Sequence, residues 1–340
     1  MAGPDPAVAL VRSAVRPALG ASDQPVLVAC SGGADSLALA AAVAFEAPRA
    51  GVPAGAVTVD HRLQAGSAER AEATAVLLRN LGLAPVVVVG ADVGADGGPE
   101  AAARSARYAA LAAVARAHGA RVALGHTLDD QAETVLLGLG RGSGPRSVAG
   151  MVEHRVAGGV TWWRPLLGVR RETTRAACAA QELPVWDDPW NADPAYTRVR
   201  LRTEVLPLLE EVLGGGVAPA LARTAAQLRE DLDALDALAA AHRPPRDGDL
   251  PVDDVAGLPA ALRRRVLRSW LRERGVPDLQ AVHLAAVDAL LTGWRGQGRV
   301  DLPGGAGVLR ASGTLVFLPP DERGPRPGDV RDTLEEPTRE

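Results

Sequence analysis

The stretch 25-PVLVACSGGADSLALAAAVAF-45 decides how this chain folds. Its first part, 25–30, is short and apolar throughout, which is typical of a strand buried on both faces of a sheet. The six residues Ser31-Gly32-Gly33-Ala34-Asp35-Ser36 follow as a glycine-containing loop, and an alanine-rich helix is expected from about Leu37 to Phe45. A strand, a glycine loop and a helix in this order predict the first unit of a parallel α/β sheet.

The same alternation continues along the first half of the chain. Apolar runs predict further strands, and periodic alanine-rich stretches predict helices between them. A parallel sheet sandwiched by helices follows, because its strands are apolar along their whole length. The expected strands are 54–60, 84–90 and 121–126, and the expected helices are 67–82, 99–118 and 129–139.

The second half predicts a smaller, mainly helical domain. A glycine-rich loop (140–150), a helix (170–183) and a polar segment (187–202) precede GGGVAP (214–219), the best linker candidate. We therefore expect a catalytic domain over 1–213, a second domain over 219–320 and a disordered, charged and proline-rich tail over 321–340. The second domain should contain helices at 219–242, 257–274 and 278–292 and two short strands around Ser312–Gly313.

Composition excludes several classes of protein. The 340 residues contain 47% hydrophobic side chains and no apolar run long enough to cross a bilayer. Arginines interrupt the N-terminus where a signal peptide needs an apolar stretch, and two cysteines form neither a disulfide framework nor a zinc cluster, so we expect a cytoplasmic protein. All 37 basic residues are arginine, so no lysine of the chain serves in catalysis. A net charge of −4 argues against a uniformly basic nucleic-acid binder.

The loop 31–36 has the chemistry of a phosphate site. Glycines let backbone N–H groups approach a phosphate, and the start of a helix adds a positive dipole. Ser31 and Ser36 supply hydroxyl donors, while Asp35 beside a phosphate implies a bridging Mg²⁺. The alternative is a serine–glycine turn that caps a helix, but ligands bind where this loop lies, at the carboxyl end of a strand. The loop is neither a lysine-containing Walker A loop nor a GxGxxG turn.

Further motifs resemble one family within the PP-loop ATP pyrophosphatases, the tRNA(Ile)-lysidine synthases. SGGADS matches the PP-loop signature SGGxDS, and the family's VDHxLR, ExxARxxRYxxL and GHxxDDQxETxLxxLxRGSG patterns are matched at 59–64, 100–111 and 125–144. RPLL (164–167) and NADPAYTRVRLR (191–202) follow in the family's order. The resemblance covers about 25–210 and implies an adenine nucleotide α-hydrolase-like fold.

The resemblance implies a reaction and the residues that perform it. Members use ATP and Mg²⁺ to adenylate C2–O of the wobble cytidine in tRNA(Ile) with a CAU anticodon, and free L-lysine then displaces AMP. His61 is expected to join the loop at the nucleotide, and Asp35, Arg107 and the pair below are the expected catalytic set. Arg107 and Arg141 are candidates for neutralising phosphate or carboxylate charge, because a guanidinium group matches both, with solvated surface arginines as the alternative.

Asp130 and Glu133 are the expected lysine-binding pair. Their i, i+3 spacing places both carboxylates on one helical face, and His126, four residues before Asp130, can face the same pocket. The alternative for Asp130 is structural, because Thr127 with Asp130 is typical of a capping box.

Two arginine-rich segments are candidates for contact with RNA phosphates. Arg198, Arg200 and Arg202 alternate with apolar residues, although a charged helix end explains them as well. In 261–274 an apolar stripe predicts core, and the arginines on the other side either bind tRNA or are simply solvated. The stripe is Leu262, Val266, Leu267, Trp270 and Leu271, and the arginines are Arg264, Arg268 and Arg272.

Other functions remain open at this point. A PP-loop tRNA thiolase typically needs two working cysteines, whereas Cys30 and Cys178 are far apart in sequence. A noncatalytic RNA-binding module disagrees with the intact motif residues. The chain departs from the family pattern at Gln64, Trp190 and Val199, and the sequence leaves association into a homodimer open.

Overall fold

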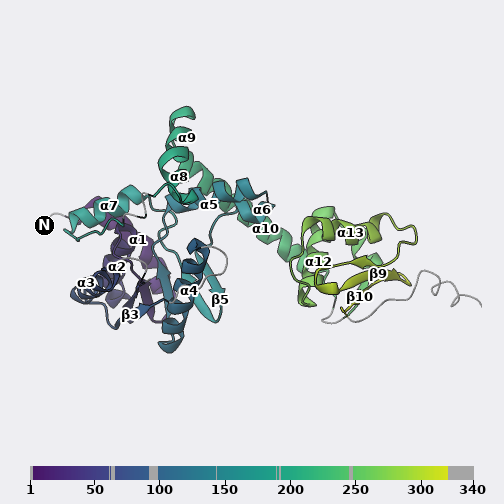
Figure 1. The fold of residues 1–340 in the computed structure, drawn as a ribbon, viewed down its shortest axis with the longest axis horizontal. Helices are drawn as coiled ribbons and strands as arrows, with labels where there is room; N and C mark the ends of the chain where they lie inside the picture. Colours follow the sequence, from purple (N-terminus) through teal and green to yellow (C-terminus); the bar gives the residue numbers. More distant parts are fainter. Residues whose placement is uncertain are drawn as a thin grey trace, which may run out of the picture. The chain divides into compact units, whose positions relative to one another are not determined.

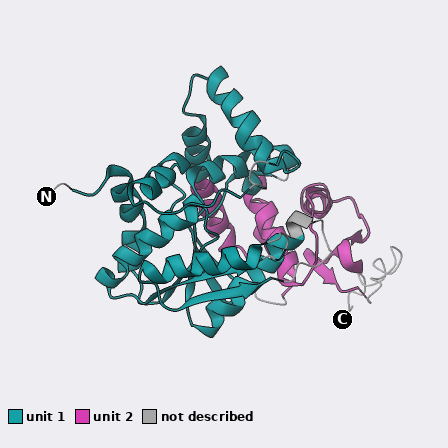
Figure 2. Ribbon diagram, turned by 60° about the vertical axis from the view of Figure 1, so that its left-hand side comes forward, with its two compact units in different colours: residues 1–228 teal, residues 229–340 magenta. Residues whose placement is uncertain are grey.

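A computed structural model describes residues 3–60, 62, 66–91, 99–142, 144–188, 190, 193–244 and 248–320. The chain forms two compact units, residues 1–228 and 229–340, which Figure 2 shows in different colours. The division lies inside one helix, α10 (Val217–Ala240). The tail predicted to be disordered, 321–340, lies outside the described residues.

The first unit is built on a six-stranded sheet in the order β3-β2-β1-β4-β6-β5. All neighbouring strands are parallel except β5, which pairs antiparallel with β6 at the edge. The strands are β1 (Val26–Ala29), β2 (Ala54–Asp60), β3 (Val86–Gly90), β4 (Arg121–Leu124), β5 (His154–Ala157) and β6 (Val160–Trp163). The predicted parallel α/β sheet is confirmed, with one antiparallel strand added.

Helices cover both faces of this sheet because the strands are apolar on both sides. From β1, Val26 and Val28 enter a core shared with α1, α2, α3 and α7, whereas Leu27 and Ala29 enter a second core with α4. Figure 1 shows α2 and α3 on one side of β3 and α4 on the other. The helices are α1 (Pro6–Gly20), α2 (Ala34–Glu46), α3 (Ser67–Asn80), α4 (Pro99–Ala117) and α7 (Arg171–Ala180), with a 3-10 turn, η1 (Pro48–Ala50).

Two features of the first unit were not predicted. Helix α1 begins at an Asp5 cap, with Pro6 in its first turn, and buries Val8, Val11, Val15 and Leu19 against α2 and α7. Strands β5 and β6 form a hairpin through Gly158 and Gly159, both with positive φ. The hairpin widens the sheet beyond the four strands that were expected.

A set of shorter helices lies at the carboxyl edge of the sheet and beyond it. These are α5 (Leu128–Arg141), α6 (Pro145–Val148), α8 (Thr197–Arg200), a π-helical turn η3 (Leu201–Val205) and α9 (Leu206–Val212). Gly214, Gly215 and Gly216, the predicted linker, all have positive φ and turn the chain between α9 and α10.

The second unit has its own core. Trp270 is fully buried among Val266, Leu267 and Leu271 on α12, so the predicted apolar stripe is confirmed as core. Helices α11 (Val252–Val255), α12 (Ala260–Glu273) and α13 (Ala281–Thr292) pack with an antiparallel sheet in the order β7-β10-β9-β8. Its strands are β7 (Leu250–Pro251), β8 (Val300–Asp301), β9 (Gly307–Ala311) and β10 (Thr314–Leu318), with a 3-10 turn η4 (Pro303–Gly305).

No single helix among the described residues is long and apolar enough to cross a membrane. One pair, Thr197–Val212 with Val217–Ala240, passes that test only when both are taken together across a 95° bend.

Candidate active site

The loop after β1 is fixed in shape by its own hydrogen bonds. Ser36 Oγ donates to the carbonyl of Gly33 (2.9 Å) and accepts from the backbone N–H of Ser31 (3.2 Å). Gly32 has φ of +87°, a conformation that favours glycine. Helix α2 starts at Ala34, and the first N–H groups of a helix have no partner within it. The loop therefore presents backbone donors in the way that the predicted phosphate site requires.

The position of the loop follows from the strand order. The order in which successive strands are added reverses at β1: β2 and β3 lie on one side of it, whereas β4 and β6 lie on the other. Ligands of open α/β sheets bind at the carboxyl ends of the strands at such a switch point. Gly125, directly after β4, lies against the first turn of α2: a Cβ there would be 2.9 Å from the carbonyl oxygen of Asp35. Only glycine lets the two segments approach this closely.

Three carboxylates meet at this switch point around one guanidinium group. Arg171, the first residue of α7, donates from Nε to Asp35 (3.3 Å), from Nη2 to Asp130 (2.6 Å) and from Nη1 to Glu133 (3.3 Å). Asp35 also accepts a hydrogen bond from the Thr174 hydroxyl. The structure thus brings together the three acids that the sequence singled out, although they come from helices α2 and α5, far apart in the chain.

Burial and the neighbouring charges set the charge state of these acids. Burial raises the pKa of Asp35, and Thr174 and Arg171 offset only part of that rise. For Asp130, burial also acts to raise the pKa, but Arg171 and the Thr127 N–H outweigh it and leave the pKa below its usual value. The carboxylate of Asp35 therefore has more to gain from a further cation than that of Asp130.

Asp130 serves the helix as well as the cluster. Its Oδ2 accepts from the backbone N–H and the hydroxyl of Thr127 (2.7 and 2.9 Å), which completes the predicted capping box of α5. Its other oxygen remains directed at Arg171. The structural and the functional interpretations of Asp130 are therefore compatible.

Glu133 is the most deeply buried member of the cluster. Its side chain is fully buried and is met by Arg202 Nε at 2.9 Å and by Arg198 Nη1 at 3.6 Å. Both arginines come from α8 and the π-helical turn η3, a rare geometry that often marks functional sites. Arg198 and Arg202, which were predicted to contact RNA phosphates, lie on this carboxylate in the structure, and their contact with RNA stays a prediction.

His126 lies close enough to Asp130 to interact with its charge, and Arg107 lies close to His126. Burial lowers the pKa of His126 to about 3, and its Nδ1 atom is buried with no hydrogen-bond partner. Arg107 has no hydrogen bond or ion pair to another described residue, and burial lowers its pKa. The charges of Arg164, Arg107 and Arg104 also lower the pKa of His126, so these arginines lie near it. Arginines that pair with none of the described carboxylates, beside a neutral imidazole, suit an anionic ligand.

Other predicted site residues are placed elsewhere. Arg200 pairs with Glu204 at 3.0 Å on an exposed surface. Arg141 is exposed at the end of α5. His61 lies outside the described residues.

The sequence interpretation missed Arg171 and Thr174. One signal was available, because Arg170 and Arg171 open helix α7, where the helix dipole disfavours positive charge.

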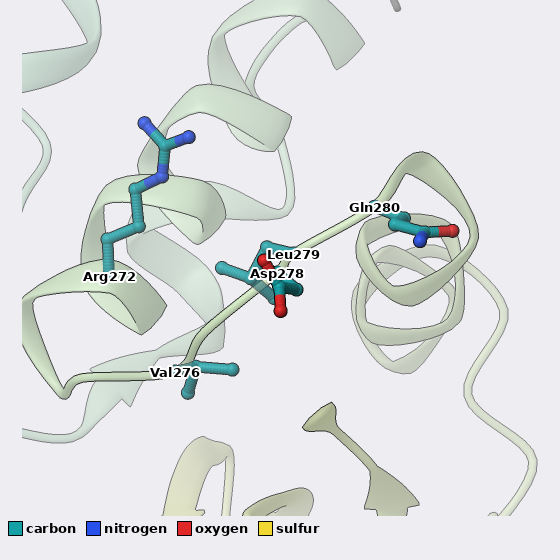
Figure 3. A pocket seen from close by; sticks show the side chains of 5 residues that line it. All are labelled: Arg272, Val276, Asp278, Leu279 and Gln280. Atoms are coloured by element: carbon teal, nitrogen blue, oxygen red, sulfur yellow. The ribbon is translucent and has the colours of Figure 1, made fainter. Parts of the chain in front are cut away.

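Two of the cavities in the described part of the chain do not involve the loop 31–36. One, of about 310 Å³, is lined by Tyr108, Trp162, Arg155 and Arg164 among others, beside the hairpin β5–β6. The other, of about 500 Å³, belongs to the second unit, between the end of α12 and the start of α13. Figure 3 shows its lining residues Arg272, Val276, Asp278, Leu279 and Gln280.

Most arginines of the face predicted on α12 have partners within the second unit. Arg264 pairs with Asp288, and Arg268 donates to the carbonyl of Leu279. Arg263, on the same helix, is buried and also paired with Asp288. These contacts favour a structural role for the arginines of this helix.

Comparison with known proteins agrees with the fold and the phosphate loop described above. A profile described as PP-loop domain matches residues 8–209, and one described as TilS substrate binding domain matches residues 250–316. The tRNA(Ile)-lysidine synthase of Streptomyces coelicolor is 55% identical over 93% of this chain and 99% of its own length. The protein of that name from Salinispora tropica is 56% identical over 94% and 99%.

A solved structure, the U34-tRNA thiolase NcsA from Methanococcus maripaludis with its [4Fe-4S] cluster, is similar in fold. It superposes with a TM-score of 0.54 at 18% identity, covering 66% of this chain and 80% of that one.

The sheet, its switch-point loop and the profile match define a PP-loop protein, a class that uses ATP. Within that class, the two profile matches and the near full-length similarity narrow the assignment further. The chain belongs to the tRNA(Ile)-lysidine synthase family.

Proposed function

We propose that this protein is a ligase that joins free L-lysine to C2 of the wobble cytidine in tRNA(Ile) with a CAU anticodon. ATP adenylates the C2 oxygen with release of pyrophosphate, and the lysine ε-amine then displaces AMP. One observation carries the proposal: an acid cluster able to bind a cation adjoins the phosphate loop at the switch point of the sheet. The reaction needs both sites within reach of one another.

The first step needs a held triphosphate. The N–H groups of Gly33 and of the first turn of α2 would bind its phosphates, and the nearby Arg107 would balance the charge that develops at the α-phosphorus. The cytidine C2 oxygen attacks that phosphorus, and pyrophosphate leaves.

The residues present fit a magnesium ion beside these phosphates. Asp35 lies in the first turn of α2, and the charge of Asp130 is close enough to raise its pKa further. One or two carboxylates with substrate phosphates are the ligand set that Mg²⁺ usually takes. When bound there, the ion would neutralise phosphate charge and orient the leaving pyrophosphate.

The second step needs an oriented lysine molecule. Asp130 and Glu133 would bind its α-ammonium group, and Arg202 and Arg198, which now meet Glu133, would bind its carboxylate. The ε-amine, with a pKa of about 10.4 in water, must lose a proton before it attacks C2. His126 stays neutral because its pKa is about 3. It would therefore position the cytosine base through a hydrogen bond rather than carry a charge.

Sulfur transfer is the rival chemistry on this fold. Cys30 and Cys178 are almost completely buried, and burial raises the pKa of both thiols, that of Cys178 to about 11. Because the thiolate is the reactive form, neither cysteine is suited to carry sulfur. A noncatalytic RNA-binding protein is the other rival.

The test is incorporation of labelled lysine into a tRNA(Ile) transcript, with and without ATP, together with pyrophosphate release. We expect ATP-dependent label in the transcript at the wobble cytidine, and its loss in Asp35→Ala with the fold retained by circular dichroism. Pyrophosphate release without lysine incorporation would indicate another PP-loop reaction. Absence of both with a folded protein would indicate a binding module. We place the reaction in the cytoplasm, where tRNA and ATP are available.

A further inference from the structure

The guanidinium group of Arg171 fills the place among the acids where a cationic substrate group should bind. Each of its three nitrogens meets a different carboxylate, at 3.3 Å from Asp35, 2.6 Å from Asp130 and 3.3 Å from Glu133. The side chain of Arg171 is only 17% exposed, so the contacts are shielded from water. Arg171 thus makes with these acids the contacts that the ammonium group of lysine would make.

Each carboxylate of the cluster is already paired with a guanidinium group in the structure. Three carboxylates face three guanidinium groups, since Arg198 and Arg202 also meet Glu133. A lysine ammonium added to this set would have no unpaired carboxylate. Charges that are paired and partly buried interact strongly, so one resident cation must leave before another enters.

Of the three guanidinium groups, that of Arg171 is best placed to leave the acids, because it also lies beside the predicted phosphate site. Its Nε contacts Asp35, in the first turn of the helix that follows the phosphate loop. A bound triphosphate brings several negative charges next to this guanidinium, and guanidinium groups bind phosphates in bidentate fashion. Arg198 and Arg202, by contrast, approach Glu133 from η3 and its preceding helix.

We propose that Arg171 is an internal substitute for the ammonium group of lysine, and that it leaves Asp130 and Glu133 for the nucleotide phosphates when ATP binds. Lysine is then admitted only after the nucleotide. The inference rests on the proposed function, because it takes the acid pair as the lysine site. It adds an order of binding, and it makes Arg171 a positioning residue for both substrates.

The proposal predicts an effect opposite in sign to that of an ordinary binding residue. Without nucleotide, Arg171→Gln should bind lysine at least about tenfold more tightly than the unchanged protein, which corresponds to ~1.4 kcal/mol. If Arg171 were a scaffold that holds the acids in place, its removal would weaken lysine binding. Arg175→Gln is the matched control, because Arg175 lies one turn along the same helix and pairs with Asp187 on the surface.

Isothermal titration of lysine into the full-length protein tests this, with and without α,β-methylene-ATP, which binds but is not cleaved between its α- and β-phosphates. The unchanged protein and Arg175→Gln should gain lysine affinity about tenfold when the analogue is present, whereas Arg171→Gln should gain little. Equal or weaker lysine binding by Arg171→Gln without nucleotide overturns the proposal. If that variant does not fold, the unchanged protein still decides, because lysine affinity that does not respond to the analogue also overturns it.

Glu133→Gln separates this inference from the proposed function. Loss of lysine binding in Glu133→Gln, with the analogue present, supports the lysine site whatever Arg171 does. Normal lysine binding in Glu133→Gln would refute the site itself, and with it both proposals.

Discussion

Gly125→Ala is a small change that should disable the active site through the backbone. Gly125 follows β4 and packs against the peptide that joins Asp35 to Ser36 in the first turn of α2. An added Cβ would lie 2.9 Å from the Asp35 carbonyl oxygen and 3.0 Å from the Ser36 nitrogen. Both obstacles are backbone atoms, so no side-chain rotation relieves the contact.

The size of the effect follows from these distances. Ordinary contact begins at 3.4 Å, so α2 and the phosphate loop must move away by about 0.5 Å. Overpacking of this kind costs about 1–3 kcal/mol, and for a unit of 228 residues this lowers Tm by about 2–12 °C. The catalytic rate should also fall, by up to a factor of about 100, which is the loss that displacement of a reacting group by about 1 Å can cause.

Pyrophosphate release and thermal unfolding, measured on the same preparation, check this prediction. Gly140→Ala is the control: it lies in α5, has no atom within 4 Å of its Cβ position, and should be neutral or slightly stabilising because alanine favours helix. We expect Gly125→Ala to lose most of its rate at a temperature where it is still folded. Normal pyrophosphate release by a folded Gly125→Ala would refute the claim that β4 sets the position of the loop.

Three further predictions concern the buried charges. Glu133→Gln should raise the KM for lysine at least tenfold and leave the KM for ATP unchanged. It should also destabilise the first unit by about 2 kcal/mol in thermal unfolding, because three arginines lose a shared carboxylate that is more buried than they are. Asp35→Asn should abolish pyrophosphate release yet raise Tm in EDTA at neutral pH. Because the pKa of Asp35 is raised in the folded protein, its charged form costs stability above that pKa. The gain in Tm should therefore vanish below about pH 4, where the carboxyl is protonated in both the folded and the unfolded state. His126→Asn should flatten the loss of stability in acid. The folded pKa of His126, about 3, lies below that of the unfolded chain, so the unchanged protein loses about 1.4 kcal/mol for each pH unit between about 6.5 and about 3. Equal slopes of the unfolding free energy against pH for both proteins, measured by chemical denaturation, would contradict this.

Most of the sheet could be predicted because its signals are local. Apolar strands, alanine-rich helices and the loop 31–36 each carry their own pattern, whereas the strand order was obtained only from the structure. The helix 6–20 was equally visible, with an Asp-Pro start and apolar residues at helical spacing, but the N-terminus was considered only as an export signal. The hairpin 154–163 carries a Gly-Gly turn, which is a recognised hairpin signal.

The partners of the predicted site residues could not be obtained in the same way. The pair Arg171–Asp35 joins positions 136 residues apart, and its geometry depends on how α7 packs beside α2. Sequence spacing predicted that Asp130 and Glu133 share a face, but it gave no information about which cation faces them. The contact of Arg202 with Glu133 was missed for the same reason, since a run of arginines does not reveal a buried glutamate 69 residues away.

Three helix starts meet at this site, and their dipoles explain why its charges are arranged as they are. Asp35 lies in the first turn of α2, Asp130 in the first turn of α5, and Arg171 is the first residue of α7. The two acids suit the positive ends of their helices, whereas Arg171 opposes its own. The contacts of Arg171 with the acids offset this local conflict in the free protein. A triphosphate at the start of α2 would offer the Arg171 guanidinium a different set of anionic partners. The position of an arginine at the start of α7, unfavourable for the helix alone, is therefore most simply explained by an anionic ligand that arrives later.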